Sequence, residues 1–153
     1  MKKIIYAIIL MLALSVFTDV AIAKERFVLV VKDEMNIMWV LDTESIVVKN
    51  NLIYAKIIME PTTFEGRRDA YQEAGPEYEN AYYSIFEIVF NKKGHEQLIK
   101  ESVFNKNRKI IIFNNYDFNM SNFVDNSKYS TNKKIRDCVF ANIKKIKNIR
   151  ELY

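Results

Sequence analysis

Few side chains in this sequence could carry a chemical step. His95 is the single histidine, and it follows Gly94 in a stretch typical of a turn, where we expect it to be exposed and structural. A zinc site needs several nitrogen or sulfur ligands at a recognisable spacing. The chain offers one histidine and one cysteine, and no carboxylate spacing completes such a set. We therefore predict neither a metal site nor a nucleophile–histidine pair.

Paired carboxylates are the other candidate for catalysis. Glu87 and Glu101 would both fall in the middle of strands, and two facing carboxylates can exchange protons with a substrate. Solvated strand faces explain them more simply. Three glycines are too few for a glycine-rich phosphate-binding loop. We therefore predict that the protein is not an enzyme and holds no cofactor.

The single cysteine, Cys138, has no second cysteine in the sequence to form a disulfide with. Exported proteins usually pair their cysteines. Cys138 is then either a small buried apolar side chain or a reactive thiol. Its place beside Val139 on the apolar side of a helix favours burial.

The N-terminus has the three parts of a secretory signal peptide. Lysines at 2–3 precede an apolar run over 4–17, and Ala-Ile-Ala at 21–23 is a small-residue cleavage site. An uncleaved anchor is the alternative, but the run is short for a membrane span. We therefore predict that residues 1–23 are removed and that the exported protein begins at Lys24.

The remainder, residues 24–153, is expected to form a single domain. No second long apolar run is present, so no membrane span is expected after removal of the signal. The residue directly after the cleavage site is Lys24 and not a cysteine, so no lipid anchor is expected. We expect a periplasmic protein, or one secreted to the medium or the cell surface. The net charge of the whole chain, +4, is too modest to argue for nucleic acid.

Runs of β-branched and aromatic residues alternate with turn residues along most of the chain. The expected strands are 26–32, 36–41, 46–49, 52–60, 81–90, 96–104 and 109–113, with turns at 42–45, 50–51, 91–94 and 105–108. Short turns between successive strands make a meander. In the strand over 52–60 the alternation predicts one buried side, made of Ile53, Ala55, Ile57 and Met59, with Leu52 and Ile58 as apolar exceptions to the pattern.

Two other segments differ from the strands. Residues 61–80 hold both prolines and an acidic cluster, and predict a long mobile loop with a helical turn near 68–73. Residues from Ser130 or Thr131 to about Asn148 predict a helix whose apolar stripe packs on the sheet. The fold class is therefore α+β, an antiparallel meander of about six strands with a C-terminal helix packed on it.

The C-terminal helix also carries most of the basic charge. Its apolar stripe must face the sheet, so the basic side chains should form an exposed ridge. The predicted partner-binding residues are Lys133, Lys144, Lys145, Lys147 and Arg150, with Lys134 beside them. The acidic 61–80 segment could instead fold over this ridge and neutralise it, or both could simply be solvated faces.

The order of these motifs resembles the surface-adhesin protein E family of bacterial exported proteins. The matching features are Trp39 with the following Asp-Thr-Glu-Ser-Ile of 42–46, the Tyr-Ser of 83–84, the late hairpin over 102–109, and a helix carrying Cys138. This chain departs from the family in three ways. It lacks the second cysteine found on the strand that matches 85–90, it has Arg108 where glycine is common, and it has no anchoring cysteine.

The resemblance implies an antiparallel sheet with a packed C-terminal helix and a role in binding host or envelope proteins rather than in catalysis. A periplasmic enzyme inhibitor or an envelope assembly factor is the alternative with the same architecture. In either case we expect a protein partner, which the residues do not identify. They also do not set the oligomeric state.

Overall fold

The computed structural model describes residues 25–71 and 75–150, with 144–150 as helix backbone alone. The predicted signal peptide, 1–23, lies outside these residues. The elements in chain order are β1 (Phe27–Lys32), β2 (Ile37–Lys49), β3 (Leu52–Pro61), α2 (Phe64–Tyr71), η1 (Pro76–Tyr78), β4 (Tyr83–Phe90), β5 (Glu96–Phe104), β6 (Ile110–Asn115), η2 (Met120–Asn122) and α3 (Ser130–Arg150).

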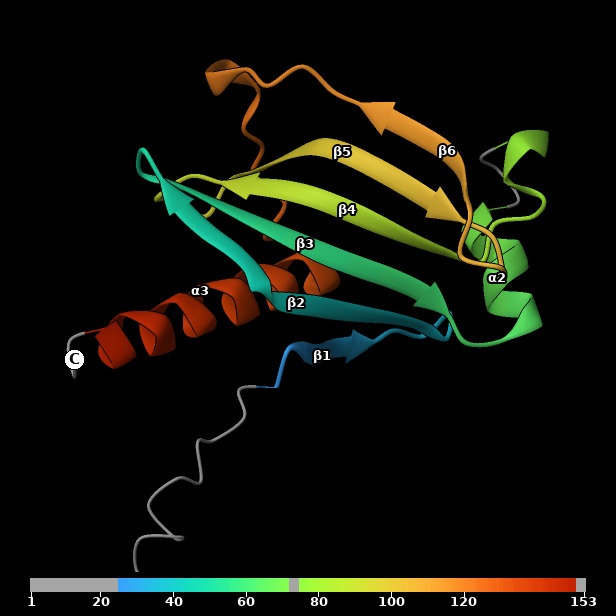
Figure 1. Cartoon of the computed structure of the whole chain (residues 1–153), viewed down its shortest axis with the longest axis horizontal. Helices are drawn as coiled ribbons and strands as arrows, with labels where there is room; N and C mark the ends of the chain where they lie inside the picture. The colour runs from blue at the N-terminus through green and yellow to red at the C-terminus, as the bar shows by residue number, and fades with distance from the viewer. Residues whose placement is uncertain (1–24, 72–74, 151–153) are drawn as a thin grey trace, which may run out of the picture.

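The strands form one six-stranded antiparallel sheet in the order β1-β2-β3-β4-β5-β6. Each strand pairs with its neighbour in the sequence, so the sheet is a meander (Figure 1). This confirms the predicted α+β class. Hairpins favour the arrangement because a short turn brings two successive strands together at little entropic cost.

The loops between strands follow the expected turn chemistry. Asn50 and Asn51 have φ of 51° and 64°, Gly94 has φ of 81°, and Arg108 has φ of 60°. Asparagine and glycine adopt this left-handed region more readily than other residues, which is why they end strands here. Arg108 adopts the same left-handed conformation although its side chain disfavours it.

The predicted turn at residues 42–45 is wrong, because β2 runs through it as one strand. Asp42 pairs with Lys56 and Val47 pairs with Tyr54, so the residues between them form a bulge. The Ser45 hydroxyl donates to the Asp42 carbonyl at 2.6 Å and accepts from the Lys56 N–H at 2.8 Å. These local hydrogen bonds satisfy backbone groups that the bulge removes from the ladder.

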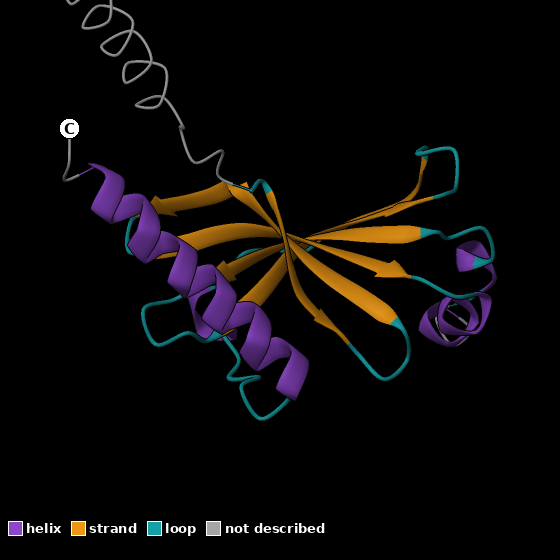
Figure 2. Cartoon of the chain, turned by 90° about the horizontal axis from the view of Figure 1, so that it is seen from below, coloured by secondary structure: helices purple, strands orange, loops and turns teal. Residues whose placement is uncertain are grey.

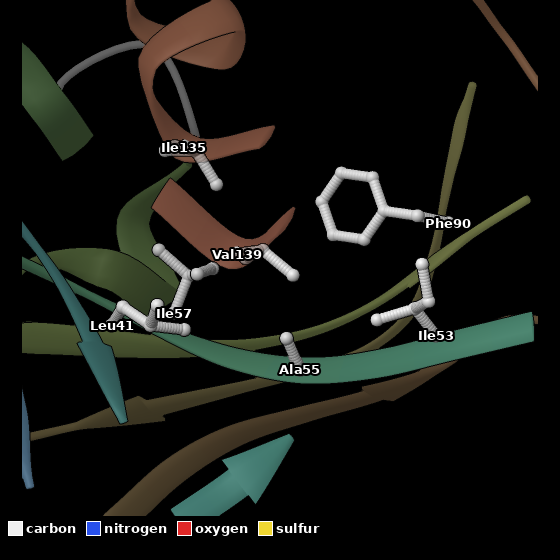
Figure 3. Packing of buried hydrophobic residues seen from close by; sticks show 7 residues of the cluster. All are labelled: Leu41, Ile53, Ala55, Ile57, Phe90, Ile135 and Val139. Atoms are coloured by element: carbon white, nitrogen blue, oxygen red, sulfur yellow. The ribbon is translucent and has the colours of Figure 1, made fainter. Parts of the chain in front are cut away.

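The C-terminal helix α3 packs on the β1–β3 half of the sheet (Figure 1). Ile135 and Val139 are buried against side chains from β2, β3 and β4, as Figure 3 shows. The rest of that cluster is Leu41, Ile53, Ala55, Ile57 and Phe90. Cys138 is half-buried rather than buried, and the Asn142 amide donates to the Cys138 carbonyl at 2.9 Å.

The segment predicted as a loop over 61–80 contains the helix α2 and the short 3₁₀ helix η1. The helix starts at Phe64, before the helical turn expected near 68–73. Tyr71 forms a buried cluster with Ile37, Met59, Ala81 and Val103. Met59 and Ile57 lie on the same side of β3, so α2 and α3 cover the same face of the sheet, at opposite ends of it (Figure 2).

Candidate interaction surface

The opposite face of the sheet has no helix on it within the described residues. We call it the open face. On β3 the helix side is buried at Ile53, Ala55, Ile57 and Met59, and the alternate residues point the other way. Strand pairing carries this assignment across the sheet, because paired residues share a face. Each row of paired residues across the open face therefore follows from the register of the strands.

Its central row is apolar on five of the six strands. The row, which we call the apolar row, consists of Leu29, Val40, Ile58, Ile85, Ser102 and Phe113. Leu29 and Phe113, on the two edge strands, are 58% and 50% exposed. The four residues between them are partly exposed. A band that is apolar except at Ser102 thus crosses the sheet, and no helix of the described residues covers it.

The neighbouring row on one side is polar. This charged row consists of Phe27, Asp42, Lys56, Glu87, Lys100 and Asn115. The Glu87 carboxylate lies 3.5 Å from the Lys56 ammonium and 3.2 Å from that of Lys100. Arg26 donates to Asp42, and this hydrogen bond raises the pKa of Arg26. Surface pairs add little stability, so the row chiefly sets a pattern of charge.

The row on the other side of the apolar row is mainly aromatic and aliphatic. This aromatic row consists of Lys32, Met38, Glu60, Tyr83, Phe104 and Ile110. The rings of Tyr83 and Phe104 stack with their centroids 4.6 Å apart and an interplanar angle of 2°. Ile110 on the edge strand is 55% exposed. Glu60 is the one carboxylate in this row.

The open face is closed at one end by the loop that follows β6. The Gln97 amide donates to the Asp117 carbonyl at 3.0 Å, and Val89 beside it is buried. Between this end and the charged row is a hollow of about 430 Å³, lined in part by Val47, Tyr54 and Ile99. The uncovered area therefore consists of the three rows and this hollow.

Such a surface is unusual on a protein that acts alone. Soluble monomers rarely expose continuous apolar patches larger than a few hundred Å². An apolar centre beside charged groups is the composition of a protein interface. The open face is therefore the candidate functional site of this chain.

The predicted basic ridge is described in part. Lys133 and Lys134 are exposed on the first turns of α3. The side chains of Lys144, Lys145, Lys147 and Arg150 lie outside the described residues. The described part of the acidic segment, residues 61–71 and 75–80, lies at the other end of the sheet from α3 in both views (Figures 1 and 2), so it does not fold over this helix.

The residues examined for catalysis are dispersed. Glu87 belongs to the open face and Glu101 to the helix side, so they do not form a pair. Glu101 accepts hydrogen bonds from Asn114 and Tyr116 at 3.0 and 3.3 Å. Burial and the Glu101 charge raise the pKa of Tyr116. His95 is half-buried rather than exposed, and its backbone N–H donates to the Asn91 side-chain oxygen at 3.1 Å.

The sequence did not reveal the open face as a site. Its signal was present in Ile58, an apolar residue on the side of β3 expected to be polar. Ile85 on β4 is its partner in the ladder. A strand that is apolar on both sides indicates two buried faces, and here only one of them has a cover.

No protein-family model matches the chain, and no curated protein or solved structure matches it either. Among the described residues no helix is long and apolar enough to cross a membrane.

Proposed function

We propose that this chain is an exported, non-catalytic binding protein, similar to the surface-adhesin protein E family, that recognises a protein partner. The observation that carries the proposal is the apolar row, which crosses all six strands of a sheet face that no described helix covers. Burying that row against a partner would remove apolar surface from water, which is the main favourable term in protein association.

The shape of the face favours a protein over a small molecule. Small ligands are held in concave pockets that bury most of their surface. Here the apolar side chains are spread across the sheet, from Leu29 on one edge strand to Phe113 on the other. The centre of the face is apolar and the charged row lies along one side, which fits a polar rim that sets specificity.

Export and adhesion complete the proposal. The signal peptide over 1–23 would deliver the domain to the periplasm, the medium or the cell surface. The resemblance to the adhesin family supports host or envelope proteins as partners. The exposed Lys133 and Lys134 of α3 would raise the association rate with an acidic partner.

The test compares two double variants in capture of purified host matrix proteins and of bacterial envelope proteins. Leu29→Glu with Phe113→Glu places charge at both ends of the apolar row. Phe64→Glu with Met120→Glu changes apolar residues that are more exposed, at 73% and 65%, but lie outside the three rows. We expect the first variant to lose at least about tenfold in affinity, because a desolvated charge opposes association, and the second to bind like the wild type.

Fluorescence of Trp39, the single tryptophan, reports whether each variant keeps its fold. Equal capture by both variants would contradict the proposal. The class of the partner captured by the wild type but not by the open-face variant then separates an adhesin from an inhibitor or an assembly factor.

A further inference from the structure

We infer that the open face is covered in solution by a second copy of the same chain, with the two sheets packed face to face around a two-fold axis along the apolar row. This inference rests on the proposed function, since it assigns a second use to the same face: the second copy covers it in the free protein, and a host or envelope partner would compete for it. The order of side chains in the three rows supports this dimer.

A two-fold axis along the apolar row brings each residue of that row close to its own copy. It also turns the charged row of one protomer onto the aromatic row of the other. On β2, β3, β4 and β5, the residue two positions before the apolar row then faces the residue two positions after it. Which pairs result depends only on the register of the sheet.

The pairs made in this way are complementary on β3, β4 and β5, whereas on β2 Met38 of one protomer faces Asp42 of the other. On β3, Lys56 of one protomer faces Glu60 of the other, which joins opposite charges. On β4, Glu87 faces Tyr83, which joins a carboxylate to a phenol.

On β5, Lys100 faces Phe104, which joins an ammonium to an aromatic ring. Sheets that pack face to face cross at an angle of about 30°. Residues on strands near the middle of the sheet are therefore displaced least from their partners.

The three rows set a minimum size for the contact. Six strands at about 4.8 Å spacing extend about 24 Å between the outer strands, and three rows spaced about 6.7 Å apart extend about 13 Å along them. This flat outline of roughly 320 Å² is smaller than the roughly 800 Å² that each partner contributes to a standard interface, so the flanking positions of the face must contribute to a stable dimer as well. Two such sheets with their apolar rows in contact form a β-sandwich, the usual way for a sheet to bury a second apolar face.

The decisive experiment exchanges the two charges of β3. Lys56 and Glu60 are four residues apart on one strand, about 13 Å, so they have no direct interaction within a protomer. In the dimer each meets the other across the axis. Lys56→Glu and Glu60→Lys should each weaken the dimer at least about tenfold, since each places like charges together. The double variant K56E/E60K restores opposite charges across the axis but still lacks the Lys56–Glu87 ion pair within each protomer, so it should dimerise at least about tenfold more tightly than the sum of the two single changes predicts.

Sedimentation velocity of the purified full chain and its variants, over a wide range of concentration, measures the dissociation constant. Lys92→Glu, in the exposed β4–β5 turn, is the matched charge control and should dimerise like the wild type. A wild-type chain that remains monomeric at every concentration overturns the inference. A double variant that dimerises no more tightly than the sum of the two single changes predicts overturns the two-fold axis along the apolar row.

A second measurement does not depend on charged variants folding. Ile58→Cys in a Cys138→Ser background places a thiol on the axis, where a short bifunctional maleimide should link two protomers. Lys92→Cys in the same background should not be linked. Failure of the Ile58→Cys protein to cross-link, while Trp39 fluorescence shows a native fold, overturns the arrangement.

The same variants separate this inference from the proposed function. If the wild-type chain is monomeric and Leu29→Glu with Phe113→Glu still abolishes partner capture, the dimer is ruled out and the proposed function stands. If these changes dissociate the dimer but partner capture is unchanged, the dimer is supported and the open face does not bind the partner.

Discussion

At the scale of single residues, Tyr71 shows how a side chain that sequence patterns assign to a loop can be central to the core. Its ring is buried, and its hydroxyl lies 3.0 Å from that of Ser84. Burial is the main cause that raises the pKa of Tyr71 to about 12. The charged phenolate cannot be solvated there, so the folded protein keeps this proton longer than the unfolded chain does.

The consequence is a loss of stability in alkali. An unfolded tyrosine titrates near pH 10. Tyr71 therefore contributes fully below about pH 10, and its contribution is lost as the pH rises through about 12. Tyr71→Phe should reduce the decline in the free energy of unfolding within this window by up to about 1.4 kcal/mol per pH unit. Urea denaturation at a series of pH values measures it.

Tyr78 and Tyr116 also have a raised pKa, so some decline should remain in the Tyr71→Phe variant. The exposed Tyr129→Phe is the control for the loss of one hydroxyl. A pH dependence of Tyr71→Phe that equals the wild type would contradict the assignment.

At the scale of elements, local chemistry explains the hairpins and long-range packing explains the helices. The Asn50-Asn51 and Gly94 turns carry residues suited to positive φ, so their strands form hairpins from local preference alone. The helix α2 begins with a local cap, because the Thr63 hydroxyl accepts from the Gly66 N–H at 2.9 Å, but a cap does not place the helix against the sheet. It is held by contacts that Tyr71 makes with residues of β2, β3 and β5.

The β5–β6 hairpin contains the one turn that works against its sequence. Arg108 is exposed and has φ of 60°, a conformation that costs a residue with a Cβ about 1–2 kcal/mol and costs glycine nothing. Arg108→Gly should therefore raise the free energy of unfolding by up to about 1 kcal/mol, after the greater flexibility of glycine in the unfolded chain is subtracted.

Thermal and urea denaturation give this difference. Asn107→Gly, at the adjoining exposed position, gains flexibility without relieving a positive φ and should destabilise slightly. If both changes lower stability equally, the strain at Arg108 does not exist.

At the scale of the whole molecule, the domain is a sheet with one covered face. Both helices lie on one side, with α3 over β1–β3 and α2 at the other end (Figures 1 and 2). The other side presents the apolar row. A domain of this size can bury enough surface on one side of its sheet to fold, which leaves the second side available for association.

Export itself is testable at this scale. We expect N-terminal sequencing of the exported protein to begin at Lys24, because Ala21 and Ala23 supply the small residues that the cleavage site requires. Ala23→Phe should block this cleavage, and the retained protein should keep the apolar run. Exported wild-type protein that still begins at Met1 would refute the signal peptide.

The sequence by itself determined most of the elements. Alternation and turn residues placed β3, β5 and the Asn50-Asn51, 91–94 and 105–108 turns, and a stripe at helical spacing placed α3. These signals are local, because side-chain direction follows from the period of a strand or a helix. The bulge in β2 was predicted as a turn because Asp, Thr and Ser are also common where a strand ends. The strand continues through them because it pairs with β3 on both sides of the bulge.

The tertiary structure decided what covers each face of the sheet. The alternation in β3 correctly predicted Ile53, Ala55, Ile57 and Met59 as its buried side, but nothing local shows that α3 packs there or that no described helix covers Ile58 on the other side. That choice depends on Ile135 and Val139 meeting β2 and β3 across a large separation in sequence. The open face is the side of the sheet on which α2 and α3 do not pack. Because its rows take one residue from each of several paired strands, the face exists only when the whole sheet has formed.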